Sequence, residues 1–347
     1  MNNTKNSCPF LRRAIDLANL ADREIKSNPP VGCVIVRDGK IIGEGRHEKF
    51  GEAHAEVNAY NDAVKNGFQP DENCEVYVTL EPCGHYGKTP PCAELISTFK
   101  PKAVHILEHD RHPVTSGKGL KILEDNGIKY EFYEVKGQPT LLSRFYKNNL
   151  KKQPWIILKY AQTADHFMAS TQGQIQISDP YTARLTHKWR SLCDGILIGK
   201  NTLETDDPEL NNRHWTGPSP IRFVVGNNFS KPLNSYKLFQ GENPGILITS
   251  NKQLSESSNC IYLPQIKWDL VWSILYEKYG INSLLVEGGS QILQSIIDEN
   301  AWDEARVITS NKVNEKADIA APQLFNSLVH ESTTLINDRI ETYLRKN

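Results

Sequence analysis

A histidine, a glutamate and two cysteines stand in the order typical of a catalytic zinc site. His54 and Glu56 lie two residues apart, and Cys83 and Cys92 each follow a proline. Imidazole and thiolate are ligands that zinc prefers, and three protein ligands with an open fourth position distinguish catalytic from structural zinc. We therefore expect His54, Cys83 and Cys92 to bind Zn²⁺, which lowers the pKa of a bound water to about 7. Glu56 would carry the protons as general acid and base.

The same four residues predict a deaminase with an unusual spacing. Zinc deaminases carry H-x-E followed by P-C-x-x-C, in which the glutamate is the acid and base and not a ligand. Here residues 84–91 separate Cys83 from Cys92, where the general pattern has two residues. The main alternative is a structural zinc site, which needs a fourth ligand, and His85 is the nearby candidate.

The apolar spacing of the first half predicts alternating helices and strands around these residues. Asp38-Gly39 is a typical two-residue hairpin turn between two apolar runs. This pattern puts His54 at the start of a helix and Cys83 directly after a strand. We expect helices at 9–25, 54–65 and 119–126, and strands at 31–36, 40–45, 75–80, 103–107 and 128–133.

A polar stretch at residues 147–154 separates two halves of the chain. The alternation then restarts, which indicates an α/β fold in both halves and predicts domains at 1–147 and 153–347. In the second half we expect helices at 181–192 and 291–297, and strands at 155–160, 195–199, 221–225, 246–249 and 281–287.

The composition bears on the partners, the location and the cysteine chemistry of the protein. Forty basic and 41 acidic residues leave a net charge of −1, so charge does not favour nucleic acid as a partner. The sequence lacks the run of about 18 apolar residues that a membrane-spanning helix needs, and we expect a cytoplasmic protein. The seven cysteines are an odd number, which argues against a disulfide framework.

Three segments of the first half resemble the RibD family of bifunctional riboflavin biosynthesis proteins, in which the longer gap between the cysteines is usual. They are NPPVGCVIV at 28–36, HAE at 54–56 and TLEPCGHYGKTPPC at 79–92. The resemblance implies a cytidine-deaminase-like three-layer α/β/α domain followed by a dihydrofolate-reductase-like α/β domain. It implies deamination of 2,5-diamino-6-(5-phosphoribosylamino)pyrimidin-4(3H)-one to 5-amino-6-(5-phosphoribosylamino)uracil, then reduction of the ribosyl group to ribityl with NADPH, in a homo-oligomer.

The resemblance also assigns roles to individual residues. In the deaminase half it implies substrate contacts from Asn28, His47, His85 and Lys88. The second half resembles the family at 188–213 and at 283–290, where two glycines precede a helix and could let backbone N–H groups approach a phosphate. There the resemblance implies NADPH contacts from Ala161, Thr202, Asp206 and Gly289. It implies substrate contacts from Arg190, Leu210, Arg213 and Glu287.

The second half also departs from the family pattern at four positions. These are His166, Gln174, Gln176 and Gly226, where the family usually has glycine, serine, tryptophan and aspartate. One alternative is therefore a RibD relative whose reductase half is inactive. Others are a deaminase of cytidine or tRNA adenosine, and a zinc protein without catalytic activity. The sequence leaves open the choice between NADPH and NADH and the identity of a reductase proton donor.

Overall fold

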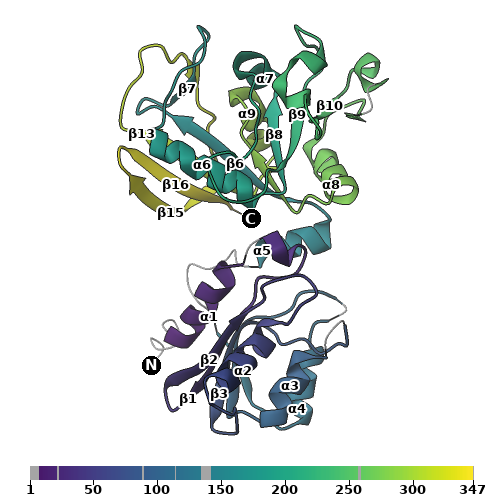
Figure 1. Ribbon diagram of the computed structural model, residues 1–347, viewed down its shortest axis with the longest axis vertical. Helices are drawn as coiled ribbons and strands as arrows, with labels where there is room; N and C mark the ends of the chain where they lie inside the picture. The colour runs from purple at the N-terminus through teal and green to yellow at the C-terminus, as the bar shows by residue number, and fades with distance from the viewer. Residues whose placement is uncertain are drawn as a thin grey trace. The chain divides into compact units, whose positions relative to one another are not determined.

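The structure is a computed structural model that describes residues 8–21, 23–87, 90–113, 115–133, 142–256 and 259–346. The chain divides into two compact units, residues 1–151 and 152–347 (Figure 1). The predicted domain limits, 1–147 and 153–347, stay a prediction, and this division falls within the linker between them. The first unit contains a five-stranded sheet and the second a nine-stranded sheet.

The sheet of the first unit has the order β2-β1-β3-β4-β5. Its strands are β1 (Gly32–Arg37), β2 (Lys40–Arg46), β3 (Cys74–Leu80), β4 (Ala103–Glu108) and β5 (Tyr130–Phe132). The predicted hairpin joins β1 to β2 through Asp38 and Gly39, whose φ angles of 50° and 72° match a turn that needs two left-handed residues. β3, β4 and β5 run parallel, so their carboxyl ends meet at one edge of the sheet.

Helices cover both faces of this sheet. Val34 and Val36 of β1 pack with α1 (Pro9–Asn19), whereas Cys33 and Ile35, pointing to the opposite face, share a cluster with three other helices. Those helices are α2 (Ala55–Lys65), α3 (Cys92–Phe99) and α4 (Lys118–Asp125). The first unit therefore has the predicted three α/β/α layers.

The helix predicted at 9–25 is shorter than expected. It ends at Asn19, and one 3₁₀ turn, Arg23–Ile25, follows later. The buried face of α1 ends at Ala18, and Leu20 is exposed, so packing does not support further turns.

The sheet of the second unit has the order β11-β10-β9-β8-β12-β6-β13-β16-β15. From β11 to β13 all neighbours run parallel, and the hairpin of β15 and β16 adds two antiparallel strands beyond β13. The strands are β6 (Trp155–Gln162), β8 (Gly195–Gly199), β9 (Ile221–Val225), β10 (Ile246–Thr249), β11 (Cys260–Tyr262), β12 (Ser283–Val286), β13 (Glu304–Ser310), β15 (Ser327–Leu335) and β16 (Asp338–Arg345). A separate pair joins β7 (Phe167–Ala169) to β14 (Ile319–Ala320).

Helices also lie on both faces of the larger sheet. Ile157 of β6 packs in the cluster of α6 (Pro180–Leu192), whereas its neighbours Ile156 and Leu158 pack with α8 (Trp268–Tyr279) and α9 (Ser290–Asp298). The helix α7 (Lys200–Asp206) follows β8 directly. The remaining helical segments are short: α5 (Ser143–Tyr146), a π-helical turn (Lys147–Lys151) and 3₁₀ turns at Leu233–Ser235, Lys237–Phe239 and Lys252–Glu256. Among the helices of the described residues, none combines the length and the apolar character that a membrane span requires.

Candidate active sites

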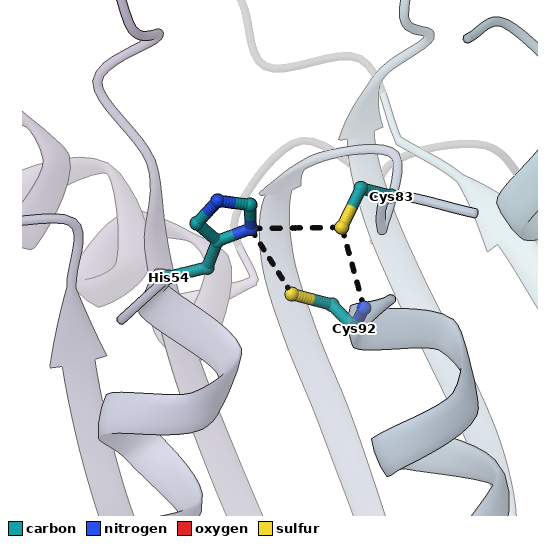
Figure 2. Close-up of side chains that lie close together, drawn as sticks. All are labelled: His54, Cys83 and Cys92. Atoms are coloured by element: carbon teal, nitrogen blue, oxygen red, sulfur yellow. Dashed lines mark hydrogen bonds between the residues drawn. The ribbon is translucent and has the colours of Figure 1, made fainter. Parts of the chain in front are cut away.

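The three predicted zinc ligands lie together at the carboxyl edge of the smaller sheet. His54 precedes α2 with an extended backbone, Cys83 follows β3 and Cys92 begins α3. Nδ1 of His54 lies 3.5 Å from Sγ of Cys83 and 3.3 Å from Sγ of Cys92 (Figure 2). The backbone N–H of Cys92 also donates to Sγ of Cys83 at 3.3 Å. Residues 38 positions apart in sequence therefore present their donor atoms to one point.

This arrangement fits tetrahedral zinc. Bond lengths of about 2.3 Å to sulfur and about 2.0–2.1 Å to nitrogen place tetrahedral N and S ligands about 3.6 Å apart. The observed separations are close to that value, and the three ligand atoms all lie within 4.8 Å of one another. The cluster contains these three residues and does not include His85, which is exposed. A closed, four-ligand structural site is therefore not formed by the described residues.

The shifted pKa values of Cys83 and Glu56 suit metal binding and proton transfer, respectively. A hydrogen bond from the Cys92 thiol, helped by His54, lowers the pKa of Cys83 to about 4. Cys83 is thus a thiolate at neutral pH, the form that binds metals. Glu56 is 5% exposed, and its burial, together with the charge of Cys83, raises its pKa to about 6. A carboxyl group with a pKa near the operating pH can both take up and release a proton.

Two predicted substrate residues of the deaminase half lie beside the metal cluster. Nδ2 of Asn28 lies 2.9 Å from Nε2 of His47, and the other ring nitrogen of His47 lies 3.1 Å from the carbonyl oxygen of Ala53. The ring centres of His47 and His54 are 5.5 Å apart. His85 lies in the exposed loop after Cys83, and the predicted phosphate contact Lys88 lies outside the described residues.

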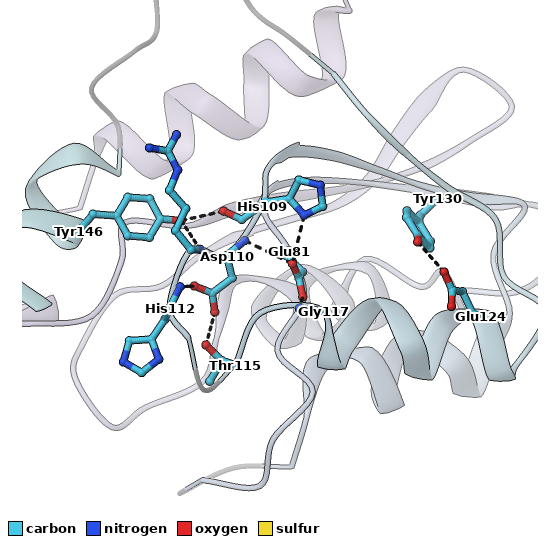
Figure 3. A network of polar contacts seen from close by, with 10 residues as sticks. Glu81, His109, Asp110, His112, Thr115, Gly117, Glu124, Tyr130 and Tyr146 are labelled. Carbon is cyan, nitrogen blue, oxygen red and sulfur yellow. Dashed lines mark hydrogen bonds and ion pairs between the residues drawn. The ribbon is translucent and has the colours of Figure 1, made fainter. Parts of the chain in front are cut away.

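Glu81 supports the loop that carries Cys83, a role that the sequence did not reveal. Its buried carboxylate accepts the backbone N–H groups of Gly117 at 2.7 Å and of Asp110 at 3.3 Å, and His109 lies 3.6 Å away (Figure 3). These contacts tie the end of β3 to the loop after β4. The network continues to Tyr146, whose hydroxyl donates to the carbonyl oxygen of His109 at 2.8 Å.

In the second unit, Arg190 and Glu287 form a buried ion pair. Nε and Nη2 of Arg190 donate to the two carboxylate oxygens at 2.9 and 2.7 Å, and Nη1 donates to the carbonyl oxygen of Asn211 at 3.3 Å. Leu210, buried and with a φ of 54°, and the exposed Arg213 belong to the same loop. Two predicted substrate contacts therefore pair with each other, and the other two lie on the loop that Arg190 contacts.

Two further residues beside this pair were missed from the sequence. Lys159 interrupts the apolar strand β6, and burial lowers its pKa although Glu287 opposes the shift. Nδ1 of His187 accepts the backbone N–H of Arg213 at 3.4 Å, and burial together with Arg190 lowers the pKa of His187 to about 4. Lys159 could have been recognised from the sequence, because it is a charged residue inside an apolar run. The sequence around His187 contains no pattern that marks it as part of the site.

Predicted cofactor residues line a cavity of about 630 Å³ in the second unit. Thr202, Asp206 and Gly289 contribute to its wall, and Ala161 does not. A Cβ atom at Gly289 would lie 3.2 Å from Oγ1 of Thr202, so the glycine leaves its backbone open to the cavity at the start of α9. This volume lies within the usual range of about 300–1,000 Å³ for small-molecule sites. Backbone N–H groups at a helix start suit a phosphate, so the wall formed by Gly289 and the start of α9 suits a cofactor that carries phosphate groups.

Comparison with known proteins identifies both halves. Residues 4–108 match the family model for the cytidine and deoxycytidylate deaminase zinc-binding region, and residues 154–313 match the RibD C-terminal domain. Riboflavin biosynthesis protein RibD from Bacillus amyloliquefaciens is 32% identical over 313 residues, covering 85% of this chain and 82% of the relative. The chain belongs to the RibD family. The RibD protein of Aquifex aeolicus is also 32% identical, over an alignment that covers 88% of this chain and 86% of that protein.

Solved structures agree with the RibD assignment. A diaminohydroxyphosphoribosylaminopyrimidine deaminase/5-amino-6-(5-phosphoribosylamino)uracil reductase from Thermotoga maritima is 30% identical, with a TM-score of 0.79 over 97% of both chains. A RibD structure from Acinetobacter baumannii is 27% identical, with a TM-score of 0.77 over 97% of this chain and 98% of that one. The predicted fold classes, the zinc-dependent deaminase half and the NADPH-dependent reductase half are therefore confirmed.

The four departures from the RibD pattern fall in different surroundings. Gln174 and Gly226 line the cavity, whereas His166 and Gln176 do not. His166 has a φ of 66°, a left-handed conformation that costs a residue with a side chain about 1 kcal/mol relative to glycine. Its backbone N–H donates to the carbonyl oxygen of Thr163 at 3.0 Å. The turn thus keeps a backbone conformation suited to glycine while carrying an imidazole.

Proposed function

We propose that this protein catalyses two consecutive steps of riboflavin biosynthesis. The first is deamination of 2,5-diamino-6-(5-phosphoribosylamino)pyrimidin-4(3H)-one, and the second is NADPH-dependent reduction of the ribosyl group of the uracil product to ribityl. The observation that carries the proposal is the buried Glu56 beside a three-residue cluster with the separations of a zinc site. The likeness of the whole chain to the deaminase/reductase of Thermotoga maritima supports the choice of substrate.

In the deaminase half, His54, Cys83 and Cys92 would hold the metal. Zinc, when bound, supplies an activated water for attack on the ring carbon that carries the amino group. Glu56 would take one proton from the water and give it to the ring nitrogen. It would then take the proton of the added hydroxyl and give it to the amino group, which leaves as ammonia. Asn28 and His47, joined at 2.9 Å, would present directed hydrogen bonds to the polar pyrimidine.

In the reductase half, the protein mainly aligns two ligands. The cavity that Thr202, Asp206 and Gly289 line would hold NADPH. Arg190, Glu287 and the loop with Leu210 and Arg213 would hold the ribosyl phosphate substrate, since guanidinium groups match phosphate geometry. Hydride transfer from the nicotinamide requires alignment of the two reacting carbons, which positioned side chains provide.

Replacement of Glu56 by glutamine tests the deaminase assignment. We expect Glu56→Gln to keep one zinc per chain, because the ligands remain, and to release ammonia about 10²–10⁴ times more slowly. Glu72→Gln, at an exposed glutamate of the same unit, is the matched control and should change neither quantity. Loss of zinc from Glu56→Gln, or full activity with zinc bound, would contradict the assigned role.

Separate measurement of the two reactions tests the bifunctional proposal. We expect saturable NADPH binding, measured by fluorescence, and NADPH oxidation that follows ammonia release on the same substrate. A RibD relative with an inactive reductase half would release ammonia without oxidising NADPH. Rapid deamination of cytidine or of tRNA adenosine, with none of the diaminopyrimidine, would instead favour the other class of deaminase.

We also propose that the protein works as a homo-oligomer on a small phosphorylated pyrimidine and not on nucleic acid. The net charge of −1 supports a small-molecule substrate. The outermost strand β15 supports self-association, since Leu328 and Val329 on it are 58% and 55% exposed and an edge strand can pair with a second copy. Light scattering after size exclusion measures the oligomeric state, and a monomeric mass at micromolar concentration would refute this part.

A further inference from the structure

The cofactor cavity contains one cationic side chain among the described residues that line it. That residue is Lys200, and Asp206 is the one acidic residue of the same wall. The other lining residues are uncharged. A nicotinamide dinucleotide carries a charged pyrophosphate, and NADPH adds a phosphate on the 2′ oxygen of its adenosine ribose. The position of Lys200 within the cavity therefore determines whether its ammonium group lies near the pyrophosphate or near the 2′-phosphate.

The order of the strands places Lys200 on the adenosine side of the cavity. β9, β8, β12 and β6 are consecutive parallel strands, so the residues after them follow one another along a single edge of the sheet. Gly289, at the start of α9 after β12, suits the pyrophosphate. In the proposed function, Glu287, which follows the same strand, and its partner Arg190 hold the substrate. If the nicotinamide lies near this pair, an adenosine that extends along the cavity towards β8 and β9 meets Lys200 and Gly226.

Gly226 leaves the space that the lysine side chain needs. A Cβ atom at this position would lie 2.8 Å from Cβ of Lys200 and 2.8 Å from Cζ of Phe229, closer than real Cβ contacts. The glycine thus keeps the cavity wall next to Lys200 free of competing side chains.

The present partner of Lys200 does not prevent this use. Its Nζ lies 3.4 Å from a carboxylate oxygen of Glu204, one helical turn away, and the lysine side chain is 34% exposed. Ion pairs with this much exposure stabilise a protein little, so a doubly charged phosphate can compete for the ammonium group. The carboxylate of Glu204 also accepts a hydrogen bond from the backbone N–H of Ser230, and this bond holds the carboxylate in place.

We propose that Lys200 binds the 2′-phosphate of NADPH and makes the enzyme prefer NADPH over NADH. This inference rests on the proposed reductase function, because it concerns the same cavity. The residue acts on binding of the cofactor and takes no part in hydride transfer.

Titration of the full-length, zinc-loaded protein with NADPH and with NADH tests the proposal. We expect Lys200→Gln to weaken NADPH binding about tenfold, since one charge-assisted contact is lost, and to change NADH binding less than twofold. Lys200→Arg keeps the charge and should keep most of the preference. Lys237→Gln removes the same charge from the same unit outside the cavity and should leave both affinities unchanged.

The possible outcomes separate this inference from the proposed function. If the unmodified protein binds neither dinucleotide, the reductase proposal fails and the inference fails with it. If it binds both equally, or if Lys200→Gln weakens both to the same extent, the reductase proposal stands and the assignment of the 2′-phosphate is overturned. A selective loss of NADPH affinity in Lys200→Gln, with the control unchanged, supports the inference.

Discussion

The ion pair of Arg190 and Glu287 should stabilise the second unit strongly. Glu287→Gln keeps the shape of the side chain but removes its charge, which leaves the guanidinium group buried without a counter-ion. The two side chains are 13% and 10% exposed and share two hydrogen bonds of 2.9 and 2.7 Å. Breaking a buried pair of this kind costs about 3–5 kcal/mol. The amide oxygen of glutamine still accepts one hydrogen bond, so we expect a loss of about 3 kcal/mol in the free energy of unfolding.

Tryptophan fluorescence during urea unfolding measures this loss selectively. All six tryptophans belong to the second unit, so their emission reports its unfolding and not that of the first. They are Trp155, Trp189, Trp215, Trp268, Trp272 and Trp302. The measurement uses protein without dinucleotide at pH 7, because ligand binding would add its own stabilisation.

A double-mutant cycle with Arg190→Gln provides the control. If the two groups stabilise each other, the two single losses in the free energy of unfolding are not additive. The double variant should then lose about 2–3 kcal/mol less than the sum of the two single losses. A loss below about 1 kcal/mol in Glu287→Gln, or simple additivity in the double variant, would refute the reasoning.

The pH dependence gives a second check on the same pair. Burial alone would raise the pKa of Glu287, but the charge and hydrogen bonds of Arg190 outweigh it and hold the pKa below the ordinary value of 4.5. The stabilisation is therefore complete above pH 4.5 and is lost as the pH falls through the lower pKa of the folded state. The difference between the unmodified protein and Glu287→Gln should narrow in that acidic range.

Two further predictions concern His187 and Gly45. Because burial lowers the pKa of His187 to about 4 from 6.5, the unfolded state binds its proton first on acidification, and stability falls between pH 6.5 and 4. His187→Gln should flatten that slope in urea titrations at several pH values, and an unchanged slope would contradict a buried neutral imidazole. Gly45→Ala should destabilise the first unit by roughly 1–3 kcal/mol, because the added Cβ would lie 2.3 Å from the backbone nitrogen of Ala59. Amide hydrogen exchange in α2 measures this, with Gly87→Ala, which meets nothing closer than 4.0 Å, as the control.

The sequence by itself determined the features that depend on local spacing. His54 begins a helix and Cys83 follows a strand because short-range apolar patterns define both elements. The Asp38-Gly39 turn formed as predicted, since few residue pairs adopt two left-handed conformations in succession. The alternation of helices and strands likewise indicated α/β layers in both halves.

Some elements gave no usable local pattern. β15 is exposed along most of its length, so apolar and polar residues do not alternate in it. The helix α8 was also missed: its buried residues include Trp268, Val271 and Trp272, but Leu270 between them is exposed, which obscures the apolar face. Both elements are stabilised by their neighbours in the folded unit rather than by their own patterns.

Only the tertiary structure decided which residues of the reductase half meet. Arg190 and Glu287 are 97 positions apart, and Lys200 and Gly226 follow different strands. Such contacts depend on the order of strands within the sheet, and helix and strand patterns do not encode that order. The parallel strands bring the residues that follow them to one edge of the sheet. For this reason only the folded chain shows that Lys200 lines the cavity with the expected cofactor residues, as the one lysine among the described lining residues.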